Sequence, residues 1–297
     1  MSEPSMGSAW ESIVSARCIV SSVMHLFYSP LVCYANSMQT GQFILHRQMV
    51  DIIREICAKK GIECTSLSND WLLELKKGGK TKRVLGYKFS LNDSVSSSIA
   101  GDKVAAHLLL KRGGIPSVEH VLLRPPVSGE QKQPLSEWEK LVVKPLDGSG
   151  GHGVRLFNDV DKAVKWIEST DHPAWAAAPF ENIIREIRVV LLDGEPLIVY
   201  EKQAVLNDGL KMFNLGMGAI PHNIEPDEEL IALALGAQSA LGLRLSAVDI
   251  IETATSERKV LEVNSGFMME NYLRASTKNR QRTVKAYEKI VDAVMAD

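Results

Sequence analysis

The stretch LVVKPLDGSGGHGVRLF, residues 141–157, decides how the rest of the chain is interpreted. Glycines occupy four of the six positions from Gly148 to Gly153, and a short apolar run typical of a β-strand flanks them on each side. The pattern G-x-G-x-x-G is present, but a dinucleotide-binding fold needs the last glycine to begin a helix, and residues 154–157 have the composition of a strand. No Gly-Lys-Ser/Thr follows, which excludes a Walker phosphate loop. The stretch therefore predicts two strands joined by a flexible glycine loop.

Such a loop can bind phosphate, because its backbone amides reach phosphate oxygens with no side chain in the way. Lys144 stands at the end of the first strand, where its ammonium group can point toward the same anion. Without Lys144, a mobile surface turn would be an equally good interpretation of the glycines. The combination favours a phosphate site.

A second set of polar residues lies near the C-terminus. In VLEVN, residues 260–264, the strand period of two places Glu262 and Asn264 on one face. Asp249 is the single carboxylate inside the apolar run 248–251. If the two strands pair through a turn at 253–258, three oxygen donors converge, and such a set suits a hard cation such as magnesium. The alternative for each carboxylate is neutralisation by a neighbouring lysine or arginine.

The remaining elements follow from hydrophobic periodicity and from turn residues. Residues 76–80, with two glycines among three lysines, predict a solvated hairpin rather than a phosphate site. We expect helices at 43–60, 98–113, 159–168 (with Asn158 as N-cap), 227–241 and 276–295, a strand hairpin at 188–201, a loop at 124–137 and an extended functional loop at 203–227.

Composition excludes several classes of protein. The chain has 297 residues, typical of about two domains, with 45% apolar and 24% charged residues, as in ordinary globular proteins. Lysine plus arginine number 34 against 36 acidic residues, so the net charge of −2 gives no general case for a nucleic-acid or membrane partner. The apolar run 19–35 contains Pro30 and is shorter than the roughly 20 residues of a membrane span. Four scattered cysteines indicate a reducing compartment, and we predict a soluble, cytoplasmic protein.

Several of these features follow one another along the chain: Lys103, Lys144, the glycine loop, Arg188, Asp249 and the Glu262/Asn264 pair. In this order they resemble the pattern of the ATP-grasp superfamily, over about residues 90–270. The similarity is greatest to its carboxylate–amine ligases, such as glutamate ligases and D-alanine–D-alanine ligase. The resemblance implies an α/β fold with α+β subdomains. An N-terminal α/β (pre-ATP-grasp) domain would cover 1–95, a central subdomain with the glycine lid 96–175, and a C-terminal subdomain with the metal site 176–297.

The resemblance also implies roles for individual residues. Lys103 and Lys144 would hold the α- and β-phosphates of ATP, and the glycine loop would close over the γ-phosphate. Adenine would meet the hinge at 178–181, where Ala178 replaces the Glu or Gln that is frequent in the family. The implied nucleotide-binding residues are Lys103, Lys144, Ser149, Gly150, Gly151, Gly153, Pro179, Phe180, Glu181, Glu186 (for the ribose) and Lys211; the implied catalytic residues are Arg188, Lys202 and Asn214; the implied ligands of one or two Mg²⁺ ions, with Mn²⁺ as a substitute, are Asp249, Glu262 and Asn264.

The implied reaction is an ATP- and magnesium-dependent ligation. ATP would phosphorylate an amino-acid-like carboxylate, and an amine would attack the acyl phosphate to give an amide, ADP and phosphate. The substrates would be small molecules or a peptide, and a homodimer is the expected assembly. Two alternatives remain open at this point: a small-molecule kinase and a non-catalytic nucleotide-binding module.

Overall fold

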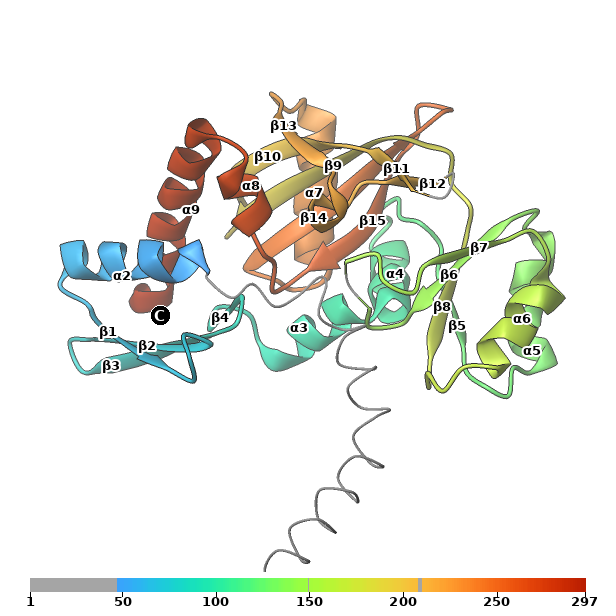
Figure 1. Cartoon of the computed structure of the whole chain (residues 1–297), viewed down its shortest axis with the longest axis horizontal. Helices are drawn as coiled ribbons and strands as arrows, with labels where there is room; N and C mark the ends of the chain where they lie inside the picture. Colours follow the sequence, from blue (N-terminus) through green and yellow to red (C-terminus); the bar gives the residue numbers. More distant parts are fainter. Residues whose placement is uncertain (1–46, 149, 208–209) are drawn as a thin grey trace, which may run out of the picture. The chain divides into compact units, whose positions relative to one another are not determined.

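The computed structural model describes residues 47–148, 150–207 and 210–297 (Figure 1). The predicted apolar run at 19–35, Cys18, Cys33 and the start of the helix predicted at 43–60 lie outside the described residues. Within the part that is described, no helix combines the length and the apolar character that a membrane crossing requires.

A five-stranded antiparallel sheet with the order β13-β10-β9-β14-β15 is the larger of the two sheets that position the candidate site (Figure 1). The hairpin predicted at 188–201 is confirmed, and its turn at Asp193-Gly194 has positive φ at both residues. Helix α7 packs on this sheet with its N-terminus capped by Asp227, whose carboxylate accepts a hydrogen bond from Leu230 N at 2.8 Å. The bounds are β9 Ile183–Leu192, β10 Glu195–Gln203, β13 Ile220–Asn223, α7 Glu228–Ala240, β14 Leu245–Thr253 and β15 Arg258–Asn264.

A second antiparallel sheet, of order β5-β8-β6-β7, carries the glycine loop. Strands β6 and β7 pair on either side of residues 146–154, which confirms the predicted strand–loop–strand unit. Helix α6 packs against this sheet, and its N-cap is Asp159, not Asn158 as predicted. Asp159 has the extended backbone that a cap needs, and its carboxylate accepts from Lys162 N at 2.8 Å. The bounds are β5 Val121–Leu123, β6 Leu141–Pro145, β7 Arg155–Phe157, α6 Val160–Glu168 and β8 Trp175–Pro179.

The prediction of a single helix over 98–113 is wrong, because two helices meet there. Asp102 has an extended backbone (φ −97°, ψ 107°), and its carboxylate accepts hydrogen bonds from Val104 N and Ala105 N, both at 2.9 Å. The cap ends helix α3, Ser94–Gly101, and begins helix α4, Lys103–Arg112. Lys103 is therefore the first residue of α4.

Two predicted loops contain short regular elements. The segment 124–137 begins with a capping box in which Ser128 and Gln131 hydrogen-bond to each other's backbone. The segment 203–227 folds back as a second small hairpin before strand β13. These elements are α5 Gly129–Lys132, the 3₁₀ helices η1 Gln133–Glu137 and η2 Leu215–Met217, and strands β11 Val205–Asn207 and β12 Leu210–Met212.

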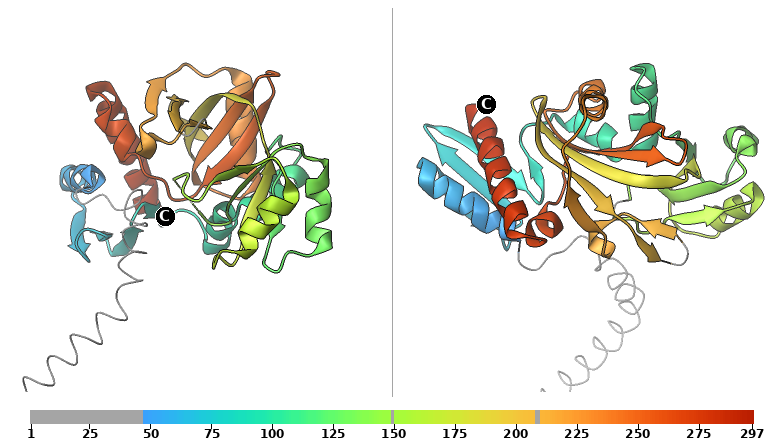
Figure 2. Two further views of the ribbon diagram at one scale, coloured as in Figure 1. Left: turned by 45° about the vertical axis from the view of Figure 1, so that its right-hand side comes forward. Right: turned by 90° about the horizontal axis from the view of Figure 1, so that it is seen from above.

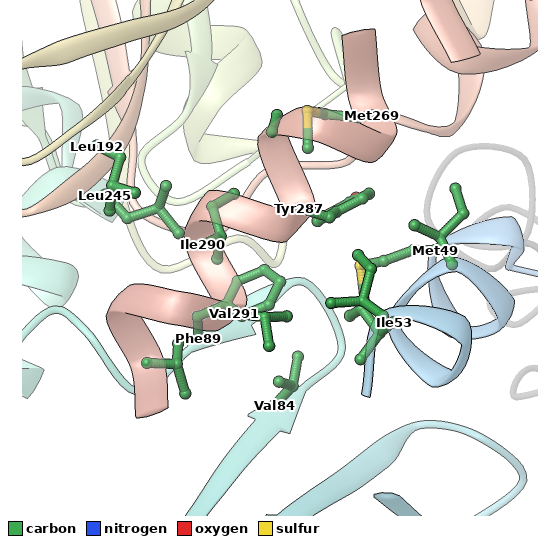
Figure 3. Close-up of a cluster of buried hydrophobic side chains, with 14 of the residues drawn as sticks. Met49, Ile53, Val84, Phe89, Leu192, Leu245, Met269, Tyr287, Ile290 and Val291 are labelled. Carbon is green, nitrogen blue, oxygen red and sulfur yellow. The ribbon is translucent and has the colours of Figure 1, made fainter. Parts of the chain in front are cut away.

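Residues 48–89 form a helix and an antiparallel meander that share a core with the C-terminal helix α9 (Figure 3). Ile53 of α2, Val84 of β3 and Val291 of α9 are all buried in this cluster, which continues to Leu192 and Leu245 of the central sheet. Both views in Figure 2 show α9 beside α2. The bounds are α2 Gln48–Lys60, β1 Glu63–Leu67, β2 Leu72–Lys77, β3 Lys80–Leu85, β4 Lys88–Phe89, α8 Glu270–Arg274 and α9 Thr277–Ala296. The hairpin predicted at 76–80 is β2–β3, and helix α8 was not predicted.

Candidate active site

A cavity of about 390 Å³, here called the nucleotide cavity, is lined by residues of both sheets and of the segment 211–214. It contains most of the residues that the resemblance singles out. The residues of that set that line the nucleotide cavity are Lys103, Lys144, Gly150, Gly151, Pro179, Phe180, Glu181, Glu186, Arg188, Lys202, Lys211, Asn214 and Glu262. Gly153, Asp249 and Asn264 do not line it, and Ser149 lies outside the described residues.

The polar residues on the central sheet belong to one face because of the strand register. Residues directly opposite each other on antiparallel strands point to the same side of a sheet. Asp249 of β14 is opposite Arg188 of β9 and also opposite Glu262 of β15. Lys202 of β10 is opposite Glu186, two residues from Arg188 on β9. The predicted pairing of the strands that carry Asp249 and Glu262 is thereby confirmed, and the five residues form one polar row.

Four members of this row form a connected network of ion pairs. Arg188 binds Asp249 through two hydrogen bonds, Nε to Oδ1 at 2.7 Å and a terminal guanidinium nitrogen to Oδ2 at 2.6 Å. Lys202 Nζ lies 2.9 Å from Asp249 Oδ1 and 2.5 Å from Glu186 Oε1. Two cations and two carboxylates thus neutralise one another in the interior, where an unpaired charge would be costly.

The network sets the charge of its members. Burial raises the pKa of the Asp249 carboxyl, but Arg188 and Lys202 outweigh burial and hold that pKa well below its usual range. Burial also raises the pKa of Glu186, which Lys202 offsets only in part. Asp249 is therefore the fixed negative centre of the row, and a neutral Asp249 would leave Arg188 and Lys202 short of a counter-ion.

Two lysines occupy the side of the nucleotide cavity next to the glycine loop. Lys103 Nζ donates hydrogen bonds to Gly148 O at 2.5 Å and Leu146 O at 3.2 Å, so the first residue of α4 is tied to the base of the loop. Burial lowers the pKa of Lys103, and it lowers the pKa of Lys144 to about 8. A bound phosphate stabilises the charged form of a partly desolvated ammonium group, because the anion takes the place of the water that burial has removed.

Three of the four glycines of the loop have backbone angles that favour glycine. Gly150, Gly151 and Gly153 have φ of 74°, 78° and 72°. A Cβ atom on Gly151 would lie 3.1 Å from Met212 Cε, so the loop approaches strand β12 closely. The loop thus lies over the cavity with little side-chain bulk, as a phosphate-binding flap requires.

The hinge expected at 178–181 comprises the last two residues of strand β8 and the two residues after it. Phe180 N donates to Lys140 O at 3.0 Å, and Glu181 Oε1 accepts from Lys259 Nζ at 2.9 Å. Ala178 is buried in the wall of the cavity. Recognition of adenine by this segment stays a prediction, as do the roles of Lys211 and Asn214. Lys211 Nζ donates to Ile183 O at 3.2 Å, and the Asn214 side chain caps η2 by accepting from Gly216 N at 2.7 Å.

Two of the three predicted metal ligands, Glu262 and Asn264, contact each other. Asn264 Nδ2 donates to Glu262 Oε1 at 3.1 Å, so the amide and the carboxylate are neighbours. Asp249 has both oxygens engaged by Arg188 and Lys202, which is the neutralised alternative that the sequence left open. No group of three or more His, Cys, Asp or Glu side chains is arranged to hold a metal in the described part of the chain.

This donor set fits magnesium, which in phosphate-transfer sites uses one or two carboxylates together with phosphate oxygens and water. Glu262 and an amide oxygen of Asn264 supply hard oxygen ligands beside the cations that would hold a phosphate chain. Asp249 retains lone-pair capacity on Oδ2, which accepts one hydrogen bond from Arg188. Its role as a metal ligand stays a prediction.

Sequence reasoning missed the apolar walls of the nucleotide cavity. Along a strand, the period of two cannot tell an apolar wall that faces a ligand from one that faces another sheet. These residues are Val118, Val142, Leu156, Ile183, Met212, Phe213 and Leu261.

Comparison with known proteins identifies the family. The model of the RimK-like ATP-grasp domain matches residues 100–288. A "Probable alpha-L-glutamate ligase" of Legionella pneumophila (strain Corby) is 29% identical over 259 residues, which cover 84% of this chain and 82% of the relative. "Probable alpha-L-glutamate ligase 2" of Shewanella amazonensis is 30% identical over 223 residues, 70% of each chain. "Glutamate--LysW ligase ArgX" of Sulfolobus acidocaldarius is 26% identical over 196 residues, 61% of this chain and 67% of the relative.

Solved structures share the fold. D-alanine–D-alanine ligase from Bacillus anthracis in complex with ATP has a TM-score of 0.53 at 20% identity, covering 69% of this chain and 67% of that chain. The ligase matches do not favour the kinase or the non-catalytic module. The chain belongs to the RimK-like ATP-grasp family, and it is an ATP-dependent ligase of the carboxylate–amine type.

Proposed function

We propose that the chain joins glutamate to a second substrate in an ATP- and magnesium-dependent reaction. One observation carries the proposal: a single cavity beside the glycine loop is lined by Lys103, Lys144 and four of the five residues of the polar row, namely Glu186, Arg188, Lys202 and Glu262. Glutamate is suggested by relatives whose names describe α-L-glutamate ligases and a glutamate–LysW ligase. The second substrate is a small acid, a peptide or a carrier protein.

The residues of the cavity suit phosphoryl transfer, which needs mainly positioning and neutralisation of charge. Lys103 and Lys144 hold the phosphates, and Arg188, fixed by Asp249, faces the transferred phosphoryl group. An oxygen of the substrate carboxylate attacks the γ-phosphorus, the bond to ADP breaks, and an acyl phosphate forms. The amine nitrogen then attacks the acyl carbon, a proton leaves the nitrogen, and inorganic phosphate departs.

Two further features support this chemistry. Gly150 and Gly151 lie over the cavity and can exclude water, which would otherwise hydrolyse the acyl phosphate. Magnesium bound by Glu262 and Asn264 would neutralise phosphate charge and orient the γ-phosphoryl group. The cytoplasmic location and the homodimer stay predictions from the sequence.

The experiment that tests this function measures ADP, inorganic phosphate and product mass together. The protein is incubated with ATP, MgCl₂ and L-glutamate, with a panel of carboxylic acids, and then with hydroxylamine in place of glutamate. A ligase forms ADP, phosphate and an amide in equal amounts, and hydroxylamine traps the activated acid as a hydroxamate. A stable phosphorylated product would instead identify a kinase, and ATP binding without turnover would identify a non-catalytic module.

A further inference from the structure

The polar row has two further neighbours on the central sheet, which the sequence did not single out. Tyr200 of β10 is directly opposite Arg188 of β9, and Asn223 of β13 is directly opposite Tyr200. Together with Asp249 and Glu262, these residues form a line of opposite positions that crosses all five strands (Figure 1). Opposite residues point to the same side of an antiparallel sheet, so Tyr200 and Arg188 share a face.

Tyr200 connects the ion pairs of the polar row with the hydrophobic core. Its side chain is only 2% exposed, and it belongs to the same buried cluster as Val190 and Ala247 of the central sheet. Its ring stacks on the ring of Tyr272 of α8, with centroids 4.6 Å apart and an angle of 25° between the planes. A ring packed in this way has little freedom to change its orientation.

Tyr272 is itself held by a polar network. Its hydroxyl donates to Asn223 Oδ1 at 2.6 Å, and a terminal guanidinium nitrogen of Arg282 donates to the same oxygen at 3.0 Å. Asn223 Nδ2 donates to Asn279 Oδ1 at 2.6 Å, and Asn279 Nδ2 donates to Tyr272 O at 3.1 Å. The stacked rings are therefore anchored to β13, α8 and α9.

The Tyr200 hydroxyl forms a hydrogen bond with the Arg188 guanidinium group. Arginine can only donate, so the hydroxyl oxygen accepts. Burial raises the pKa of Tyr200 above its usual value, which keeps the hydroxyl neutral at the working pH of an enzyme. Two of the five N–H groups of Arg188 are bound by Asp249, and the other three remain for Tyr200 and for an anion in the nucleotide cavity, which Arg188 lines.

Arg188 is thus held from both neighbouring strands. Asp249 lies on β14 and Tyr200 on β10, the two strands that flank β9. A guanidinium group is a rigid planar fork, so its orientation decides whether its N–H groups reach a phosphoryl oxygen. The ion pair with Asp249 supplies a charge partner on one side, and the hydroxyl supplies a second contact that fixes the direction of the fork.

We propose that Tyr200 is a positioning residue, which holds the Arg188 guanidinium group toward the transferred phosphoryl group. The proposal rests on the proposed function, because that function assigns Arg188 to this phosphoryl group. Tyr200 does not line the nucleotide cavity, so it acts through Arg188 and not on the substrate itself.

The first test compares steady-state kinetics of tyrosine-to-phenylalanine variants of the full chain. Tyr200→Phe removes the hydroxyl and keeps the ring that stacks on Tyr272. We expect kcat to fall about tenfold and KM for ATP to stay within about twofold, because charge on the phosphoryl group develops in the transition state. The melting temperature should stay close to that of the unchanged protein.

Two matched variants separate the contact with Arg188 from the mere loss of a buried hydroxyl. Tyr287→Phe changes a tyrosine that is equally buried and whose hydroxyl has no hydrogen-bond partner among the described residues. Tyr272→Phe keeps the stacked ring and removes the hydroxyl that binds Asn223. Both should retain kcat within about twofold. If Tyr272→Phe lowers kcat as much as Tyr200→Phe does, Tyr200 has no specific role.

The second test measures the positioning of Arg188 without any turnover. Aluminium fluoride bound beside MgADP takes the place of the transferred phosphoryl group, so calorimetric titration with MgADP is done with and without it. We expect Tyr200→Phe to raise the Kd about tenfold in the presence of aluminium fluoride and to leave the Kd of MgADP alone unchanged. Tyr287→Phe should match the unchanged protein in both titrations.

The outcomes separate this proposal from the proposed function. An aluminium fluoride complex that depends on Tyr200, in a protein that does not ligate glutamate, would support the positioning role and contradict the reaction with glutamate. Ligation of glutamate with equal kcat in Tyr200→Phe and Tyr287→Phe would contradict the positioning role alone. A raised KM for ATP with unchanged kcat in Tyr200→Phe would also overturn it.

Discussion

Glu262 lines the nucleotide cavity, and none of the residues that the structure describes forms an ion pair with it, whereas Arg188 and Lys202 hold Asp249. Its neighbour Asn264 donates to it, which leaves the second carboxylate oxygen for a cation. We therefore predict that the charge of Glu262 serves a bound cation rather than the fold.

Glu262→Gln keeps the shape of the side chain and removes its charge. We expect kcat to fall about 100-fold or more, because a magnesium ligand and its charge stabilisation are lost. The melting temperature should stay close to that of the unchanged protein. Glu257→Gln, an exposed change in the turn before β15, is the matched control and should leave kcat unchanged. Full activity of Glu262→Gln would remove the metal assignment.

The charge of Lys144 depends on pH in the working range of an enzyme. Burial lowers its pKa to about 8, so the ammonium group is charged below that pH and neutral above it. We expect kcat/KM for ATP, which reports the free enzyme, to fall as the pH rises through about 8. Lys144→Arg stays charged throughout and should lack this fall, whereas Lys162→Arg on α6 should retain it. A flat profile in the unchanged protein would contradict the phosphate role of Lys144.

The break between α3 and α4 places Lys103 at the start of a helix, because Asp102 caps that helix. Asp93 caps α3 and Asp102 caps α4, each with two backbone N–H groups at 2.9 Å. The two caps are alike in geometry, but only the second is followed by Lys103. They therefore form a natural pair for separating stability from positioning.

Asp93→Ala and Asp102→Ala should each lower the free energy of unfolding by about 1 kcal/mol, the usual worth of an N-cap. Only Asp102→Ala should also raise KM for ATP several-fold, because the start of α4 holds Lys103 against Leu146 O and Gly148 O. Urea unfolding and ATP kinetics on both variants check this. If Asp93→Ala raises KM for ATP as much as Asp102→Ala does, the cap has no specific role in placing Lys103.

The largest of the buried clusters joins residues that are distant in sequence (Figure 3). Residues of α2, β2, β3 and α9 share a buried cluster with Leu192 and Leu245 of the central sheet. Glu270 of α8 is fully buried and accepts hydrogen bonds from Met49 N at 3.0 Å and Gln48 N at 3.1 Å. The start of α2 thus depends on a carboxylate that follows strand β15 in sequence.

This shared core predicts that α2 and the meander unfold cooperatively with α9 and the central sheet. Ile53→Ala should lower the free energy of unfolding by about 2–5 kcal/mol, as expected for a large-to-small change at a fully buried site. Unfolding should remain a single transition by circular dichroism and by tryptophan fluorescence. Val95→Ala, at an exposed position of α3, should change stability by less than about 0.5 kcal/mol. Two separated transitions in Ile53→Ala would show that α2 and the meander unfold independently.

Features encoded over a few neighbouring residues could be predicted from the chain alone. The glycine hairpin, the strands that carry Asp249 and Glu262, and the hairpin at Asp193-Gly194 each depend on a local pattern, a period of two or a turn residue. The order of the lysines, the glycine loop and the acidic residues along the chain was enough to predict the ATP-grasp family, which the comparisons confirm. The division into domains and the individual site roles stay predictions.

Features that join distant segments appeared only once the chain was folded. Asp249 meets Arg188 across 61 positions of sequence, and Glu270 meets Gln48 across 222. No local pattern specifies such partners, because side chains acquire neighbours from other strands only when the sheets are in register. The contacts of Tyr200 with Arg188 and with Tyr272 have the same origin, because the three residues come from β10, β9 and α8. The sequence supplied the chemical groups, and packing decided which groups neutralise each other and which remain available to a ligand.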